Sequence, residues 1–108
     1  MYIAMNRFKV VKGREAEFEE MWLNRESYLD EVPGFVEFHF LRGPERDDHR
    51  LYSSHTVWAS YAAFEDWTRS EAFRKAHANA GTRNAGMLLG GPEFEGFEVV
   101  NEIKPQAS

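Results

Sequence analysis

The chain has 108 residues, of which 43% are hydrophobic and 15% aromatic, and its formal net charge at pH 7 is −5. This length fits one domain with a buried core, and the acidic balance with scattered Lys and Arg argues against a nucleic-acid partner. The absence of cysteine excludes disulfides, thiolate metal ligands and a cysteine nucleophile. No apolar run approaches the roughly 20 residues of a membrane span, so we expect no membrane partner and a cytoplasmic protein.

The first predicted element is a strand over residues 2–11, where side chains alternate between two faces. Asn6 falls on the more apolar of these faces. Its companions there are Ala4, Phe8 and Val10. A polar amide in such company is a candidate functional group.

A helix is predicted from residue 15 to about residue 29, because inward-facing residues recur at helical spacing. Its inward stripe consists of Phe18, Met21, Trp22, Arg25 and Leu29. The dipeptide Pro33-Gly34 then makes a turn. Beyond the turn we predict a strand over 35–41, a polar hairpin loop over 42–50 and a strand over 51–58.

Residues 60–80 are predicted to form the second helical region. Phe73, Ala76, His77 and Ala80 lie three and four residues apart, which places them on one inward face. Phe64 and Trp67 make a second inward cluster. On a straight helix Trp67 and His77 would be about 15 Å apart, which is far for one small ligand. Ser70 favours an N-cap and Glu71 suits a first turn, so we predict two helices that meet near Ser70.

The remaining elements are a glycine-rich connection over 81–92, a strand over about 94–103 and a frayed tail over 104–108. The order β-α-β-β-α-β predicts an α+β, ferredoxin-like domain over residues 1–103, with both helices on one face of an antiparallel sheet. Large apolar residues on both faces of this sheet indicate that the face without helices packs against a second copy. We assign Met5, Val36, Phe38 and Phe40 to that uncovered face and expect a homodimer.

The four histidines differ in their surroundings. His49 is expected to be solvated in the hairpin loop, His39 to be a surface or interface residue, and His55 to be satisfied by neighbouring Ser and Thr. His77 alone combines an apolar helix face with a nearby Trp. Spacing alone still favours a satisfied core histidine over a ligand there. One well-placed His disfavours a zinc site with three protein ligands, whereas a single axial His suits haem.

Three motifs carry a resemblance to a known family: A-M-N-R-F-K-V-V-K-G, T-V-W-A-S-Y-A-A-F-E-D-W and S-E-A-F-R-K-A-H. Together they resemble the small, dimeric haem-degrading monooxygenases of the IsdG type, within the antibiotic-biosynthesis-monooxygenase group of dimeric α/β barrels. The resemblance covers nearly all of the chain. In that family an Asn on the first strand, a Trp and an axial His form the catalytic set, and these match Asn6, Trp67 and His77.

The resemblance implies that haem is both cofactor and substrate, with dioxygen and an electron donor or reductase as further partners. His77 would ligate the iron, and Trp67 would press on the macrocycle from the distal side. Asn6 would donate a hydrogen bond to the activated oxygen, unless its amide only bonds neighbouring backbone.

Phe64 and Phe73 would help to bind the ring. Trp22 would form a pocket wall and Arg25 would pair with a propionate, although packing alone could also explain both residues. A cofactor-free quinol-type monooxygenase and a non-catalytic haem-binding protein remain alternatives.

Overall fold

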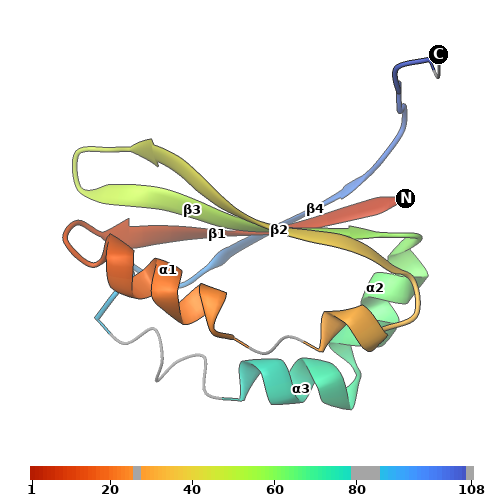
Figure 1. Ribbon diagram of the computed structural model, residues 1–108, viewed down its shortest axis with the longest axis horizontal. Coiled ribbons are helices and arrows are strands. Elements are labelled where there is room, and N and C mark those ends of the chain that lie inside the picture. The colour runs from red at the N-terminus through yellow and green to blue at the C-terminus, as the bar shows by residue number, and fades with distance from the viewer. Residues whose placement is uncertain (26–27, 79–85, 107–108) are drawn as a thin grey trace.

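The computed structural model describes residues 1–25, 28–78 and 86–106 (Figure 1). Its elements are β1 (Tyr2–Val11), α1 (Glu15–Leu23), a short 3₁₀ helix η1 (Leu29–Glu31), β2 (Phe35–Glu45), β3 (His49–Trp58), α2 (Tyr61–Thr68), α3 (Glu71–His77) and β4 (Glu93–Glu98). The predicted β-α-β-β-α-β order is confirmed, with the second helical region divided in two. No helix in these three segments is long and apolar enough to span a membrane.

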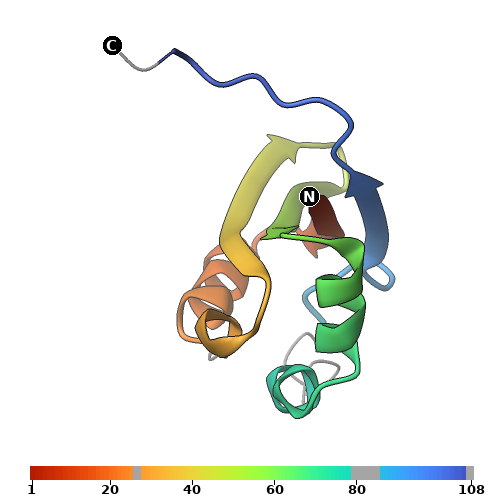
Figure 2. The same cartoon turned by 90° about the vertical axis from the view of Figure 1, so that its right-hand side faces the viewer.

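The four strands form one antiparallel sheet in the order β2-β3-β1-β4. Figure 2 shows α1, α2 and α3 on the same side of this sheet, which confirms the ferredoxin-like fold. Two groups of buried residues lie between the helices and the sheet. One comprises Tyr2, Ala4, Leu29 and Trp58, and the other Phe8, Val10, Phe18 and Tyr52.

Helix α1 is shorter than predicted. It ends at Leu23, with Asn24 as its C-cap, and Leu23 itself is 81% exposed. Tyr28 has a left-handed backbone (φ 59°), which a continuing helix does not allow. Leu29 therefore belongs to η1, where it is still buried against the core. The apolar spacing identified a buried leucine but not the end of the helix before it.

A buried phenol and an ion pair hold α1 to the sheet. Tyr52 on β3 donates a hydrogen bond to Glu19 Oε2 at 2.5 Å, and Arg42 Nε on β2 donates to the same oxygen at 2.9 Å. The hydrogen bond from Arg42, followed by that from Tyr52, lowers the pKa of Glu19 below its ordinary value. Burial raises the pKa of Tyr52. These contacts fix the orientation of α1 over the sheet.

The predicted polar loop over 42–50 is mostly strand. Strand β2 continues to Glu45 and β3 begins at His49, so only three residues connect them. Arg50 Nε donates to the Gly43 carbonyl at 2.8 Å, and Arg46 N donates to the His49 carbonyl at 2.8 Å. Gly and Pro predicted a loop here, but β2 is an edge strand, where a proline costs no sheet hydrogen bond.

A β-bulge in β2 overturns the predicted assignment of its faces. The β2–β3 pairing runs from Phe35↔Trp58 directly to Glu37↔Val57, so Val36 is left without a partner. The bulge shifts the alternation, and Phe38 and Phe40 stack on Trp22 of α1 with ring centroids 6.0 and 5.0 Å away. These two phenylalanines therefore lie under the helices, not on the uncovered face.

The last strand is also shorter than predicted, because β4 ends at Glu98 and residues 99–106 have no regular structure. The chain runs away from the sheet here (Figures 1 and 2), with Val100 94% and Ile103 87% exposed. Of the predicted connection over 81–92, residues 81–85 lie outside the described segments. Met87 and Leu89 extend the edge of β1 through hydrogen bonds with Val11 and Lys9.

Candidate active site

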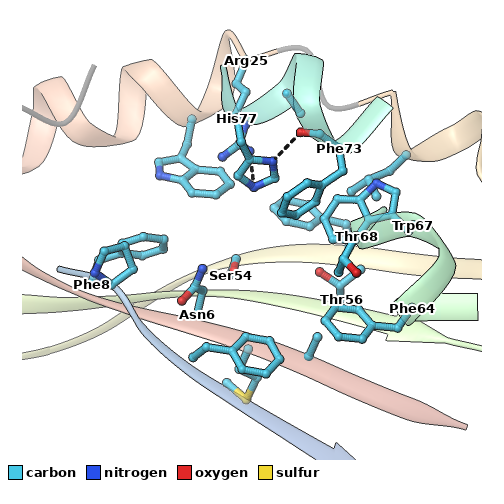
Figure 3. Close-up of a pocket in the computed structure, with 18 of the residues that line it drawn as sticks. Asn6, Phe8, Arg25, Ser54, Thr56, Phe64, Trp67, Thr68, Phe73 and His77 are labelled. Carbon is cyan, nitrogen blue, oxygen red and sulfur yellow. Dashed lines mark hydrogen bonds between the residues drawn. The ribbon is translucent and has the colours of Figure 1, made fainter. Parts of the chain in front are cut away.

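A cavity of about 530 Å³ lies between the helices and the sheet (Figure 3). It is lined by all seven residues predicted to bind a ligand. These are Asn6, Trp22, Arg25, Phe64, Trp67, Phe73 and His77. They come from β1, α1, α2 and α3 and the residues following α1, so the fold gathers at one place side chains that lie up to 71 positions apart in the sequence.

The break between α2 and α3 brings His77 to Trp67. Ser70 is the N-cap of α3, and its Oγ accepts a hydrogen bond from Phe73 N at 3.1 Å and donates one to the Trp67 carbonyl at 2.6 Å. The ring centroids of Trp67 and His77 are 5.9 Å apart. The predicted meeting of two helices near Ser70 is confirmed, and it removes the separation that a straight helix would impose. Ala80, placed on the same face by sequence, lies outside the described segments.

The His77 ring is oriented by its own helix. Its Nδ1 lies 2.8 Å from the Phe73 carbonyl one turn earlier, and a carbonyl can only accept, so Nδ1 carries the proton. Nε2 is then the nitrogen with the free electron pair that can accept a hydrogen bond or ligate a metal. A backbone carbonyl on the second ring nitrogen is the arrangement found for metal-ligating histidines. Phe73 also stacks on the ring, with centroids 4.1 Å apart.

Arg25 is the partner of His77 Nε2 across the cavity. Its Nη2 lies 3.3 Å from Nε2, and its guanidinium carbon lies 4.4 Å from the centre of the Trp22 ring. The arginine therefore donates to the same electron pair that a metal would take. A metal bound to His77 requires the Arg25 side chain to turn away.

Asn6 faces the cavity from the sheet. Figure 3 shows Asn6 and its β3 partner Ser54 on the sheet side, opposite His77 on α3. The amide oxygen of Asn6 is buried and has no hydrogen-bond partner among the described residues. The nearest positions along β1 on the same face, Ala4 and Phe8, are buried and apolar. A flat molecule in the cavity would have an imidazole on one face and an amide on the other.

The cavity has aromatic walls, part of which the sequence analysis did not identify. Phe94 of β4 stacks on Phe64 with centroids 5.7 Å apart and an interplanar angle of 9°. Phe38 stacks on Trp22 at 13°. Phe94 pairs with Asn6 in the β1–β4 register, which is set by tertiary structure and is not visible in the sequence. Phe38 was assigned to the opposite face because the bulge leaves no local signal.

The cavity fits a broad, largely apolar ligand with a few polar groups. Its volume lies within the roughly 300–1,000 Å³ of small-molecule and cofactor sites. The indole nitrogens of Trp22 and Trp67 are also buried without a hydrogen-bond partner in the described segments. Buried polar atoms normally have partners, so these atoms are suited to contact a bound molecule. Haem would fit such a cavity, because the walls are aromatic and Nε2 of His77 could bind its iron.

Comparison with known proteins assigns the chain to a family. The model of the antibiotic biosynthesis monooxygenase family matches residues 1–79, and the chain belongs to this family. It is an oxygenase-type enzyme with the ferredoxin-like fold of that family.

Three of the relatives represent two kinds of oxygenase. A haem oxygenase (staphylobilin-producing) of Staphylococcus aureus is 29% identical over 83 residues, which are 77% of each chain. The haem degrader MhuD of Mycobacterium tuberculosis, solved with two haems in its active site, is 29% identical with a TM-score of 0.72 over 96% of this chain and 100% of that one. SnoaB of Streptomyces nogalater, a cofactor-independent oxygenase, is 27% identical with a TM-score of 0.65 over 96% of this chain and 97% of that one.

Proposed function

We propose that this enzyme is a haem-degrading monooxygenase that binds haem through His77 and opens the porphyrin ring. The observation that carries the proposal is that His77 lines the cavity with its Nδ1 held by the Phe73 carbonyl, which leaves the electron pair of Nε2 as the one that can bind a metal. The similarity to the haem oxygenase of S. aureus and to MhuD supports the same substrate. Haem with dioxygen and electrons from a donor supplies the oxidative chemistry, which releases iron and an open tetrapyrrole.

The residues of the chain have distinct roles in this proposal. Nε2 of His77 binds the substrate iron from the α3 side. Asn6 faces the opposite side of the ring, where its amide can donate a hydrogen bond that orients the oxygen. Trp67 lies beside His77 and contacts the macrocycle, and contact of this kind can distort a haem ring. The apolar walls exclude water from the reacting carbon.

Arg25 has two successive partners in this proposal. Before haem binds, it donates to Nε2 of His77 and stacks on Trp22. Iron takes the same electron pair, so the guanidinium is released and can pair with a propionate of the substrate. Arginine suits this second role because it binds carboxylates through two parallel hydrogen bonds.

A hemin titration tests the binding step. Purified protein should develop a five-coordinate haem spectrum, and His77→Ala should abolish it. His49→Ala is the matched control, since His49 lies at the β2–β3 turn beside Asp48 and should not change the spectrum. An unchanged spectrum in His77→Ala would contradict the ligand assignment.

Single turnover with ascorbate or a reductase tests the chemical step. Asn6→Ala should bind hemin with nearly unchanged affinity but lose the haem absorbance about a hundredfold more slowly, because losing one preorganised donor costs roughly 2.7–4 kcal/mol. Cleavage at the parent rate would leave Asn6 with a structural role only. A stable haem complex that is never cleaved would indicate a haem-binding protein without this activity.

The alternative is a cofactor-independent oxygenase that acts on an aromatic quinol-type substrate in the same cavity. The similarity to SnoaB supports it, and it predicts no haem spectrum after hemin is added.

We also propose that the enzyme works as a cytoplasmic homodimer that packs the uncovered sheet faces together. Support comes from Leu41 and Phe97, which are 39% and 47% exposed. Phe97 pairs with Ile3 and Leu41 follows Phe40 by one residue, so both point away from the helices.

A further inference from the structure

We propose that Ser54 is a second hydrogen-bond donor beside Asn6, and that the two side chains together orient the dioxygen that attacks the substrate. This inference rests on the proposed haem-degrading function and adds one residue to its chemistry. Ser54 lies on β3 and lines the same cavity as Asn6. Figure 3 shows both side chains on the sheet side of the cavity, opposite His77.

The strand register places the two side chains next to each other. Asn6 of β1 and Ser54 of β3 are direct partners in the antiparallel pairing. Such partners share one face of the sheet and have Cβ atoms about 4.5–5.5 Å apart. Phe94 of β4 pairs with Asn6, and Phe40 of β2 pairs with Ser54. This row across the sheet therefore has two polar side chains in the middle and a phenylalanine at each end.

Among the described residues, neither the Asn6 amide oxygen nor the Ser54 hydroxyl has a hydrogen-bond partner. The neighbouring Ser53 hydroxyl donates to the Ser54 carbonyl at 2.9 Å, which leaves the Ser54 hydroxyl itself available. Ser54 is half-buried, and polar groups shielded from bulk water normally have partners. An amide and a hydroxyl side by side on the floor of an aromatic cavity are therefore suited to contact a bound molecule.

The spacing allows both donors to reach one oxygen atom. Hydrogen bonds span about 2.5–3.2 Å between heavy atoms, so an oxygen above the pair can accept from the Asn6 amide nitrogen and the Ser54 hydroxyl at once. A flat substrate bound through His77 would present its other face to this pair. Two donors restrict the direction of the oxygen more than one does, because a single hydrogen bond leaves rotation about its axis free.

The register distinguishes Ser54 from a second hydroxyl on the same face of β3. Thr56 also lines the cavity and is buried, but its partner on β1 is Ala4. Asn6 and Thr56 are diagonal neighbours, which lie about 7–8 Å apart in a sheet. Ser54 is therefore the hydroxyl better placed to share one oxygen atom with Asn6.

Carbon monoxide on the reduced haem complex is a probe for donors on this side of the ring. A hydrogen bond to its oxygen lowers the C–O stretching frequency, because the donor stabilises the negative charge that iron transfers to the ligand. Ser54→Ala and Asn6→Ala should each move the infrared band to higher frequency, and the double variant should move it farthest. Ser53→Ala is the matched control, because Ser53 lies on the other face of β3, and its band should match that of the parent.

Single turnover measures the contribution of Ser54 to the reaction. Ser54→Ala should bind hemin as the parent does and lose the haem absorbance about tenfold more slowly, since one neutral hydrogen bond contributes up to about that factor. Threonine and valine have nearly the same shape and both suit a strand, so Ser54→Thr and Ser54→Val differ mainly in the hydroxyl. Ser54→Thr should keep most of the rate, whereas Ser54→Val should behave as Ser54→Ala does.

Thermal denaturation and hemin titration establish that each variant is folded and loaded. A parent-like infrared band and cleavage rate in Ser54→Ala and Ser54→Val would overturn the inference, and so would equal behaviour of Ser54→Thr and Ser54→Val. Either result would leave haem binding through His77 unaffected. The absence of a haem spectrum in the parent would instead overturn the proposed function, and this inference with it.

Discussion

The substitution Ser70→Ala tests whether the break between α2 and α3 positions the proposed iron ligand. Ser70 Oγ accepts a hydrogen bond from Phe73 N at 3.1 Å and donates one to the Trp67 carbonyl at 2.6 Å. Alanine removes both bonds. Helix α3 has only seven residues, so its first turn is a large part of it. The substitution should therefore loosen the segment that carries His77.

The expected cost is about 1–2 kcal/mol, because removing an N-cap side chain costs roughly 0.5–2 kcal/mol and the second hydrogen bond of Ser70 places it in the upper part of that range. For a domain of this size, each kcal/mol lowers the melting temperature by about 4–8 °C. If the lost free energy destabilises α3 alone, a smaller fraction of molecules holds His77 in its position at the cavity. The apparent haem affinity can then decrease by up to about 5–30-fold.

Hemin titration and thermal denaturation of the same samples provide the assay. Ser60→Ala is the matched control, because Ser60 caps α2 through one hydrogen bond to Ala63 N at 3.1 Å and α2 does not carry His77. It should lower the melting temperature but weaken haem binding less than Ser70→Ala does. Ser70→Asp, which keeps the acceptor, should recover part of the affinity. If Ser70→Ala melts earlier but binds hemin as the parent does, the reasoning about the helix break is wrong.

Three further predictions concern the sheet. Gly96→Ala should destabilise the protein by about 1–3 kcal/mol in urea denaturation, as overpacking does, because its Cβ would lie 1.8 Å from the Tyr2 hydroxyl oxygen. The hydrogen bond from Arg42 lowers the pKa of Glu19 in the folded state. The ionised Glu19 therefore stabilises the fold fully at a pH above the ordinary carboxyl pKa, and this stabilisation is lost as the pH falls through the lowered pKa of the folded state. In Glu19→Gln the melting temperature should therefore fall less steeply at acid pH than in the parent. An unchanged fall would exclude the Glu19–Arg42 pair as its cause. Phe97→Glu should shift sedimentation toward monomer without unfolding the chain, whereas a parent-like dimer would argue against packing through this face.

The sequence by itself determined the order of the elements and the division of the second helical region. These features depend on local signals, since alternation, helical spacing and the capping preference of Ser70 each act within a few residues. The same signals placed Asn6 and His77 on inward faces, and the structure has both lining the cavity. The family resemblance added roles for these residues that spacing alone did not provide.

Tertiary structure decided the faces of β2 and the partners within the cavity. The bulge at Val36 arises from pairing with β3 and has no local signature, so Phe38 could not be assigned to the cavity from alternation. The contact between Arg25 and His77 joins residues 52 positions apart. Contacts of this kind depend on how helices pack on the sheet, and the free energy of that packing is shared among many distant residues. Local preference determines which elements form, but only packing decides which side chains meet.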